Sequence, residues 1–174
     1  MVKGIIYLLL GQKGSGKTYI GNLFDKEFKI KFLRVEDWAK KVKKDRQFDN
    51  TEYLNEVFNV IETGVRNSLK IYSEIVFEST GLTDQFDRML ANLMKDYKVV
   101  TIGVQTDSKL CVDRVRTRDQ SIHINVSDDQ LNEINHQVIK KGIKTNYVLQ
   151  NNNSTYDKLI NEVSKILTNV SPNR

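Results

Sequence analysis

Short apolar runs alternate along the chain with longer stretches in which apolar residues recur every three or four positions. Residues 5–10 form a nearly continuous apolar run, which is typical of a strand buried on both faces of a parallel sheet. Further apolar runs predict four more strands, at 30–35, 75–77, 99–104 and 147–149. Helical periodicity predicts helices at about 16–28, 37–45, 50–72, 83–96, 108–118, 128–140 and 155–168.

Two of the predicted helices have recognisable starts. Residues 127–130, Ser-Asp-Asp-Gln, match a capping box, and Ser154 or Thr155 is a suitable N-cap for the last helix. The alternation of strands and helices predicts an α/β domain with a parallel sheet and right-handed crossovers. No repeat or linker divides the chain, so we expect one domain over 1–170, followed by a polar tail at 171–174.

Composition narrows the class of protein without identifying a ligand. Among the 174 residues, 39% are hydrophobic and 28% are charged, which is typical of a soluble globular protein. No apolar run approaches the ~18 residues of a membrane span, so we expect a cytoplasmic protein with no membrane partner. The net charge of +5 favours polyphosphate ligands and is compatible with nucleic acid. The single cysteine, Cys111, excludes an internal disulfide, and the oligomeric state stays open.

A glycine-rich segment directly after the first predicted strand carries the strongest functional signal. Residues 11–18 match the pattern G-x-x-x-x-G-K-T, in which glycines let successive N–H groups turn inward around phosphate oxygens. The start of the next helix adds partial positive charge. We expect Lys17 to reach the outer phosphates and the Thr18 hydroxyl to ligate Mg²⁺. The predicted ligands are therefore ATP, with GTP as an alternative, and Mg²⁺. The predicted phosphate-binding residues are Gly11, Gly14, Ser15, Gly16, Lys17 and Thr18.

Acidic residues follow the second and third predicted strands, at the edge of the sheet where ligands bind. A kinase must position an acceptor hydroxyl, accept its proton and neutralise the transferred phosphoryl group. Glu36 or Asp37, after the second strand, could activate the hydroxyl. Glu78, after the third, could hold Mg²⁺ through water or fix the acceptor together with Thr80 and Gly81. Any of the three acids could instead cap the following helix.

Paired arginines follow the fourth predicted strand. Arg114 and Arg118 are four residues apart and would share a helix face, where two guanidinium groups can clamp a phosphoryl group. The alternative is a solvated helix whose arginines pair with neighbouring aspartates. The polar stretch that follows lacks a clear period, so we expect a lid over about 112–127. His123 lies in this lid, and we expect a surface or substrate contact there rather than a catalytic base.

These motifs together resemble the small P-loop kinases of the adenylate kinase-like group. The chain is most similar to the kinase domain of the polynucleotide 5′-hydroxyl kinases, and more distantly similar to shikimate and gluconate kinases. The resemblance covers 5–167, but only the phosphate loop is a sharp match. It implies a three-layer P-loop fold whose five parallel strands have the order 2-3-1-4-5.

The resemblance also implies roles for particular residues. In the polynucleotide kinases an aspartate just after the second strand is the general base, and this chain has Glu36 and Asp37 there. Their lid carries two arginines four apart, which Arg114 and Arg118 match. Their third strand ends in a Ser-Asp-Thr stretch, whereas here the acid, Glu78, is displaced by one position. The glycine triplet of shikimate kinases is absent, which argues against shikimate as the acceptor.

The leading hypothesis is an ATP- and Mg²⁺-dependent kinase. The acceptor hydroxyl would belong to a small molecule, a nucleoside, a nucleotide or a nucleic-acid end, and residues 38–72 are expected to cover it. The alternative is a nucleotide-binding regulatory or switch module with little phosphotransfer. A guanine-reading Asn-Lys-x-Asp stretch, which a GTPase switch would need, does not occur in the sequence. The paired arginines also favour transfer over sensing.

Overall fold

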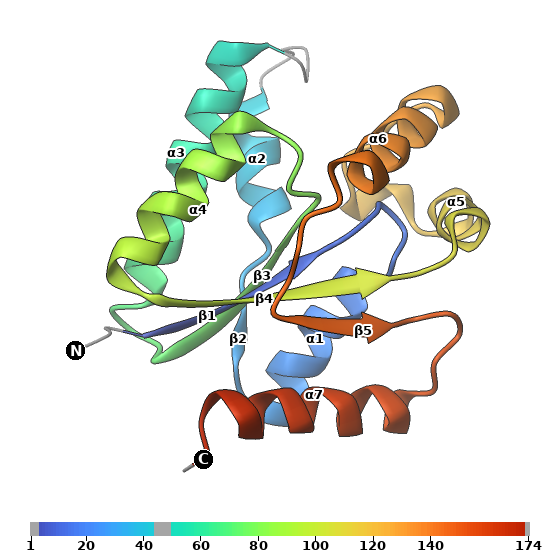
Figure 1. Cartoon of the computed structure of the whole chain (residues 1–174). Helices are drawn as coiled ribbons and strands as arrows, with labels where there is room; N and C mark the ends of the chain where they lie inside the picture. Colours follow the sequence, from blue (N-terminus) through green and yellow to red (C-terminus); the bar gives the residue numbers. More distant parts are fainter. Residues whose placement is uncertain (1–3, 44–49, 173–174) are drawn as a thin grey trace.

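Five parallel strands form a sheet in the order β2-β3-β1-β4-β5, which confirms the predicted order (Figure 1). The computed structural model describes residues 4–43 and 50–172, so the predicted helix end at 44–45 lies outside the described residues. The strands are β1 (Ile5–Leu10), β2 (Lys31–Phe32), β3 (Glu74–Ser79), β4 (Lys98–Gln105) and β5 (Tyr147–Gln150).

Helices cover both faces of this sheet. Figure 1 shows α2, α3 and α4 over one face and α1 and α7 over the other, in three layers. The helices are α1 (Lys17–Phe28), α2 (Val35–Lys43), α3 (Thr51–Ser68), α4 (Asp84–Asp96), α5 (Ser108–Thr117), α6 (Asp128–Lys141) and α7 (Tyr156–Val170), with a short 3₁₀ turn, η1 (Gln120–Ile122), between α5 and α6.

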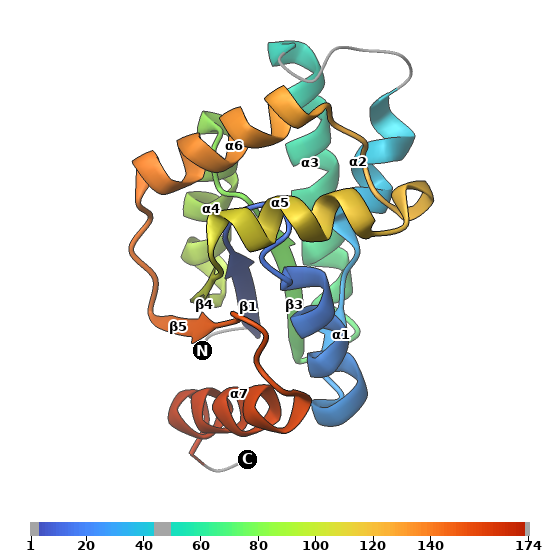
Figure 2. The same ribbon diagram turned by 90° about the vertical axis from the view of Figure 1, so that its right-hand side faces the viewer.

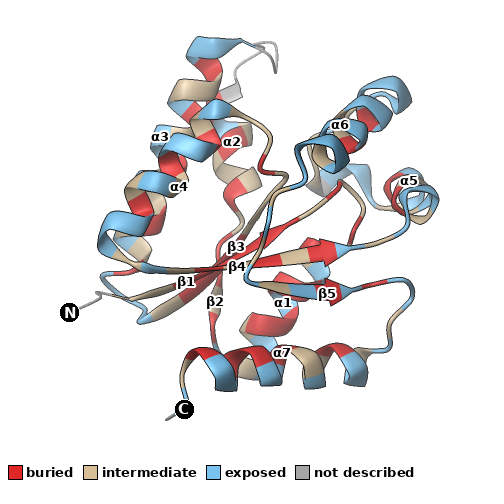
Figure 3. Ribbon diagram, in the orientation of Figure 1, coloured by how far each residue is buried: buried red, intermediate tan, exposed pale blue. Residues whose placement is uncertain are grey.

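The position of β1 in the middle of the sheet explains why its residues are apolar at successive positions. Ile6 and Leu8 pack in the core beneath α2, α3 and α4, whereas Tyr7 and Leu9 pack in the core beneath α1 and α7. All four side chains are inaccessible to solvent, because successive side chains of a strand point to opposite faces. Figure 3 shows the resulting band of buried residues through the middle of the sheet.

Most of the predicted helix and strand ends agree with the structure, including two that capping residues indicated. Ser127 and Gln130 form the predicted capping box at the start of α6, and Thr155 caps α7 by accepting a hydrogen bond from the Lys158 N–H. The second strand is shorter than the predicted 30–35, because α2 already begins at Val35. The helix predicted over 50–72 ends at Ser68.

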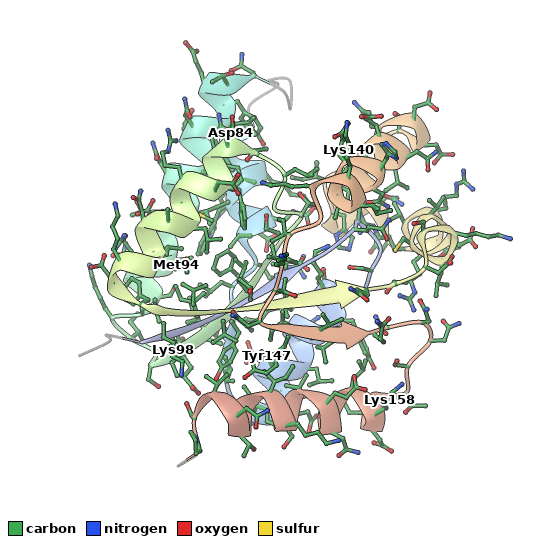
Figure 4. All side chains as sticks on the ribbon, viewed as in Figure 1. Asp84, Met94, Lys98, Lys140, Tyr147 and Lys158 are labelled. Carbon is green, nitrogen blue, oxygen red and sulfur yellow. The ribbon has the colours of Figure 1, made fainter. Side chains whose placement is uncertain are left out.

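The carboxyl ends of the strands carry the phosphate loop and the segment predicted as a lid. Figure 2 shows α5 and α6 lying across this edge, above α1. Exposed lysines such as Lys140 on α6 and Lys158 on α7 lie on outer surfaces of the molecule (Figure 4), so part of the positive charge is solvated. Over 4–43 and 50–172, none of the helices has the length and apolar character needed to cross a membrane.

Candidate active site

The glycine-rich loop joins the end of β1 to the start of α1. Gly14 and Gly16 have φ angles of 86° and 96°, in the left-handed region that side chains disfavour. A Cβ atom at Gly14 would collide with the main-chain carbonyl of Cys111 on α5, and one at Gly16 would collide with the Asn151 amide. Both glycines are therefore required by the backbone turn and by the close approach of neighbouring elements.

Three other elements hold this loop in place. The Asn135 side chain on α6 accepts a hydrogen bond from the Lys13 N–H (2.8 Å) and donates one to the Lys13 carbonyl (3.1 Å). The Thr106 hydroxyl, after β4, donates to the Ser15 carbonyl (2.9 Å), and so does the Asn151 amide after β5 (2.8 Å). The loop is therefore preorganised by contacts that come from distant parts of the chain.

Lys17 and Thr18, the first residues of α1, already have partners within the loop and its surroundings. The Lys17 Nζ donates to the carbonyls of Gly11 (2.9 Å) and Gln12 (2.7 Å). Burial lowers the pKa of Lys17 to about 8, although the nearby Glu78 carboxylate opposes this shift. The Thr18 hydroxyl donates to Glu78 Oε1 (2.7 Å), which links the start of α1 to the end of β3.

A cavity of about 440 Å³ opens beside the loop, between it, α2, α3 and the segment after α5. Four cationic side chains line this cavity: Lys13, Lys17, Arg114 and Arg118. Two carboxylates, Glu36 and Glu78, line it as well. Positive charge therefore exceeds negative charge among the lining residues, which suits a polyanionic ligand.

The two arginines reach the cavity in different ways. Arg114 lies on α5 and donates to the Asn151 carbonyl (3.0 Å) and to Asn153 Oδ1 (3.4 Å). Arg118 lies just past the end of α5, where burial lowers the pKa of its guanidinium although Glu36 and Glu78 oppose this. Arg114 Nη1 and Arg118 Nε are buried and have no hydrogen-bond partner among the described residues. Such unpaired donors are costly unless a ligand satisfies them.

Glu36 and Asp37 both lie in the first turn of α2, but only Glu36 lines the cavity. The Ile124 N–H donates to Glu36 Oε1 (2.6 Å), and His123 Nδ1 lies 3.2 Å from Glu36 Oε2. Burial alone would raise the pKa of Glu36, but the Ile124 N–H, Lys13 and His123 together hold it below its ordinary value. The Asp37 side chain is 48% exposed and pairs with Arg34 at 3.2 Å.

The residues at the end of β3 and just after it separate into two groups. Glu78 and Thr80 line the cavity beside the loop, as does the intervening Ser79. Gly81 is not among its lining residues: its φ of 76° makes a turn, and its carbonyl accepts a hydrogen bond from Lys141 Nζ (2.6 Å). This hydrogen bond therefore links the turn at Gly81 to α6.

Comparisons with known proteins rest on structure. No family model matches the chain, and no curated protein is recognisably similar to it in sequence. A sugar kinase from Janibacter sp. HTCC2649 has a TM-score of 0.71 and 12% identity, covering 97% of this chain and 96% of its own. A gluconokinase from Sinorhizobium meliloti 1021 has a TM-score of 0.68 and 12% identity, covering 99% and 95%. A chain of the Pnkp1/Rnl/Hen1 RNA repair complex has a TM-score of 0.65 and 14% identity, covering 82% and 47%.

The chain has the fold of the small P-loop kinases. This fold combines the five-stranded order with a glycine-rich loop between β1 and α1. It also includes a segment after β4 that crosses the ends of the strands. Proteins with this P-loop kinase fold act on diverse acceptors, so the side chains of the site must supply the argument about function.

The oxygen atoms near the loop fit a magnesium ion. The Thr18 hydroxyl and the Glu78 carboxylate are adjacent, and both are hard oxygen donors of the kind that Mg²⁺ prefers. Within 4–43 and 50–172, no three His, Cys, Asp or Glu side chains lie together as a metal cluster. A Mg²⁺ ion needs only one or two protein ligands when phosphate oxygens and waters supply the others, so this small donor set is sufficient.

Sequence reasoning missed several residues of the site. Lys13 lines the cavity, but the motif did not indicate it, because Lys13 occupies an x position at which any residue type is allowed. Asn135 is only 4% exposed, and its signal was visible: a polar residue lies one helical turn after the buried Leu131 on α6. Asn151 begins a run of three asparagines after β5, and such a run is typical of turns and does not single out one residue. The contact between His123 and Glu36 joins residues 87 positions apart, which no local pattern could indicate.

Proposed function

We propose that the protein is an ATP- and Mg²⁺-dependent kinase that transfers the γ-phosphoryl group to an alcohol. The observation that carries the proposal is the convergence of four cations and an anchored carboxylate, Glu36, on one cavity beside the loop. A protein that only binds a nucleotide needs cations but no carboxylate aimed at an acceptor. The similarity to a sugar kinase and a gluconokinase supports an alcohol as acceptor. A cytoplasmic location, where ATP and Mg²⁺ are abundant, is part of the proposal.

The triphosphate tail would lie along the loop, whose N–H groups and helix start attract anions. Lys17 would exchange the carbonyls of Gly11 and Gln12 for phosphate oxygens, which favours its charged form. The unpaired guanidinium donors of Arg114 and Arg118 would find phosphate acceptors. Thr18, with Glu78 acting directly or through water, would hold Mg²⁺, and that ion neutralises charge on the phosphate oxygens when it is bound.

In the chemical step the acceptor oxygen attacks the γ-phosphorus, and the bond from that phosphorus to the β–γ bridging oxygen breaks. ADP leaves with the electron pair, and the hydroxyl proton passes to the Glu36 carboxylate. Because the pKa of Glu36 is held low, this group is a weak base, and its main role is to orient the hydroxyl and take the proton late. That is sufficient, since phosphoryl transfer depends mostly on positioning and charge stabilisation. Residues 112–127 would act as the lid that excludes water.

The test is phosphoryl transfer from radiolabelled ATP to pools of nucleosides, 5′-hydroxyl oligonucleotides, sugars and simple aromatic alcohols. We expect labelled product from at least one pool with the wild-type protein and almost none with Lys17→Ala. Lys165→Ala, which removes an exposed lysine on α7, is the matched control and should keep full activity. Tight ATP binding without product from any pool would contradict a kinase and favour the regulatory module.

A further inference from the structure

The predicted lid meets α2 at the Glu36 carboxylate, and Figure 2 shows the segment between α5 and α6 beside α2. The Ile124 N–H donates to Glu36 Oε1 (2.6 Å), and His123 Nδ1 lies 3.2 Å from Glu36 Oε2. The side chains of His123 and Glu36 are only 9% and 19% exposed. An ionised carboxylate can only accept hydrogen bonds, so Nδ1 carries a proton in this contact. Two successive lid residues therefore donate to both oxygens of one carboxylate.

A folded turn carries the imidazole to α2. Asp119 caps η1 by accepting hydrogen bonds from the N–H (2.9 Å) and the hydroxyl (2.7 Å) of Ser121. Gln120 Nε2 donates to the Val115 carbonyl on α5 (2.5 Å), and the His123 N–H donates to the Gln120 carbonyl (3.4 Å). Hydrogen bonds within the turn and to α5 therefore fix the backbone that carries the imidazole.

These hydrogen bonds control the direction of the carboxylate more closely than charge attraction does. Glu36 is also attracted by Lys13 of the phosphate loop and by Arg118 just past α5. Attraction between charges varies slowly with angle, whereas a hydrogen bond weakens steeply away from its preferred geometry. The imidazole and the Ile124 N–H therefore set the plane of the carboxylate. Each of its oxygens keeps a further lone pair for an acceptor hydroxyl.

We propose that His123 is a positioning residue whose imidazole holds the Glu36 carboxylate in the orientation in which it meets the acceptor hydroxyl. This inference rests on the proposed kinase function and deepens it. It gives the lid a second task besides excluding water, because opening the lid separates both donors from Glu36. Glu36 is then aligned for transfer only while residues 112–127 cover the site.

The first experiment compares two replacements of His123. His123→Asn keeps an N–H donor near the place of Nδ1, whereas the leucine of His123→Leu is about as large and has no donor. We expect His123→Leu to lower kcat about tenfold, as for a lost hydrogen bond to a charged group, and to change the KM for ATP by less than about twofold. His123→Asn should keep most of kcat. His136→Leu, which removes an exposed histidine on α6, is the matched control. Equal losses in His123→Asn and His123→Leu, or no loss in His123→Leu, would overturn the inference.

A double-mutant cycle tests whether His123 acts through Glu36. Glu36→Gln has already lost the charge that the imidazole orients. Adding His123→Leu to Glu36→Gln should therefore lower kcat by less than about twofold, compared with about tenfold in the wild-type background. If His123 only stabilised the lid, the loss would be the same in both backgrounds, and that result would contradict the positioning role.

The last experiment detects the contact without any turnover. The carboxyl signals of the protein labelled with ¹³C-glutamate are titrated with pH, and Glu36→Gln identifies the signal of Glu36. His123→Leu keeps this carboxylate buried but removes a donor to its charged form, so the pKa of Glu36 should rise. The variant keeps Lys13, Arg118 and Asp119, whose charges also act on this pair. An unchanged pKa would overturn the inference. A raised pKa with no phosphorylated product from any acceptor would overturn the kinase proposal and leave the positioning of Glu36 standing.

Discussion

Lys17 shows how a single residue can be prepared for a polyanion. Its ammonium group is buried against two loop carbonyls, and burial lowers its pKa from 10.5 to about 8. The unfolded chain therefore binds more protons than the folded chain between those two pH values. The contribution of Lys17 to the free energy of unfolding accordingly rises with pH across that window and is unfavourable below it.

This pKa predicts that nucleotide binding is coupled to proton uptake. Phosphate oxygens should return Lys17 to its charged form, so MgATP binding at about pH 8.5 should take up a fraction of a proton per site. Calorimetric titrations in two buffers of different ionisation enthalpy measure that fraction. Lys17→Met should abolish the uptake. Identical heats of binding in both buffers for the wild-type protein would show that Lys17 is not titrating in response to the ligand.

The two adjacent acids after β2 should differ sharply in their effect on turnover. Glu36→Gln keeps the size and one acceptor for the Ile124 N–H but removes the charge that orients the hydroxyl. We expect kcat to fall by roughly 10²-fold, the lower end of the range for a lost general base, because Glu36 mainly orients the hydroxyl. Asp37→Asn breaks only a half-exposed pair with Arg34, so kcat should change by less than about fivefold. A larger loss in Asp37→Asn would move the catalytic role to Asp37.

At the scale of elements, α6 contacts the phosphate loop as well as packing against the rest of the fold. Its buried Asn135 makes two hydrogen bonds to the main chain of Lys13, and its start is joined through the lid to α5, which carries Arg114. One helix therefore contacts the phosphate loop directly and is linked to a lid arginine through the chain. We therefore expect motion of the lid to shift the phosphate loop through the hydrogen bonds between Asn135 and Lys13.

Removing the Asn135 amide should weaken nucleotide binding. Asn135→Ala leaves the Lys13 N–H and carbonyl without their partners, so we expect the Kd for MgATP to rise about tenfold, as for one or two lost buried hydrogen bonds. Asn132→Ala, an exposed position on the same helix, is the control and should bind normally. Calorimetry gives both affinities. Equal affinities in the two variants would mean that α6 does not preorganise the loop.

Element prediction succeeded where the decisive forces are local. The continuous apolar run of β1 and the Ser127 capping box depend on neighbouring residues, and both were predicted from them. The length of β2 was not, because Val35 could extend the strand or begin α2, and packing decided for α2. The pairing of Glu36 with the lid was also missed, since hydrogen bonds over 87 and 88 positions leave no periodic trace.

At the scale of the whole molecule, the parallel sheet collects side chains from separate segments at one edge. The loop after β1, Glu36 after β2, Glu78 near the end of β3 and the arginines after β4 all line one cavity. The order of the strands and the phosphate loop, both expected from the sequence, predict that these residues lie close together. The contribution of α3 to the lining of the cavity was not predictable, because α3 reaches the cavity through packing rather than through a motif.

The central claim is that the loop after β1 holds the polyphosphate tail of a nucleoside triphosphate. The most direct measurement is calorimetric titration with ATP, ADP and AMP in the presence of Mg²⁺, for the wild-type protein and for Lys17→Ala. The account predicts that affinity falls in the order ATP, ADP, AMP and that Lys17→Ala loses most of the ATP affinity. AMP binding as tightly as ATP, or ATP affinity unchanged in Lys17→Ala, would contradict it.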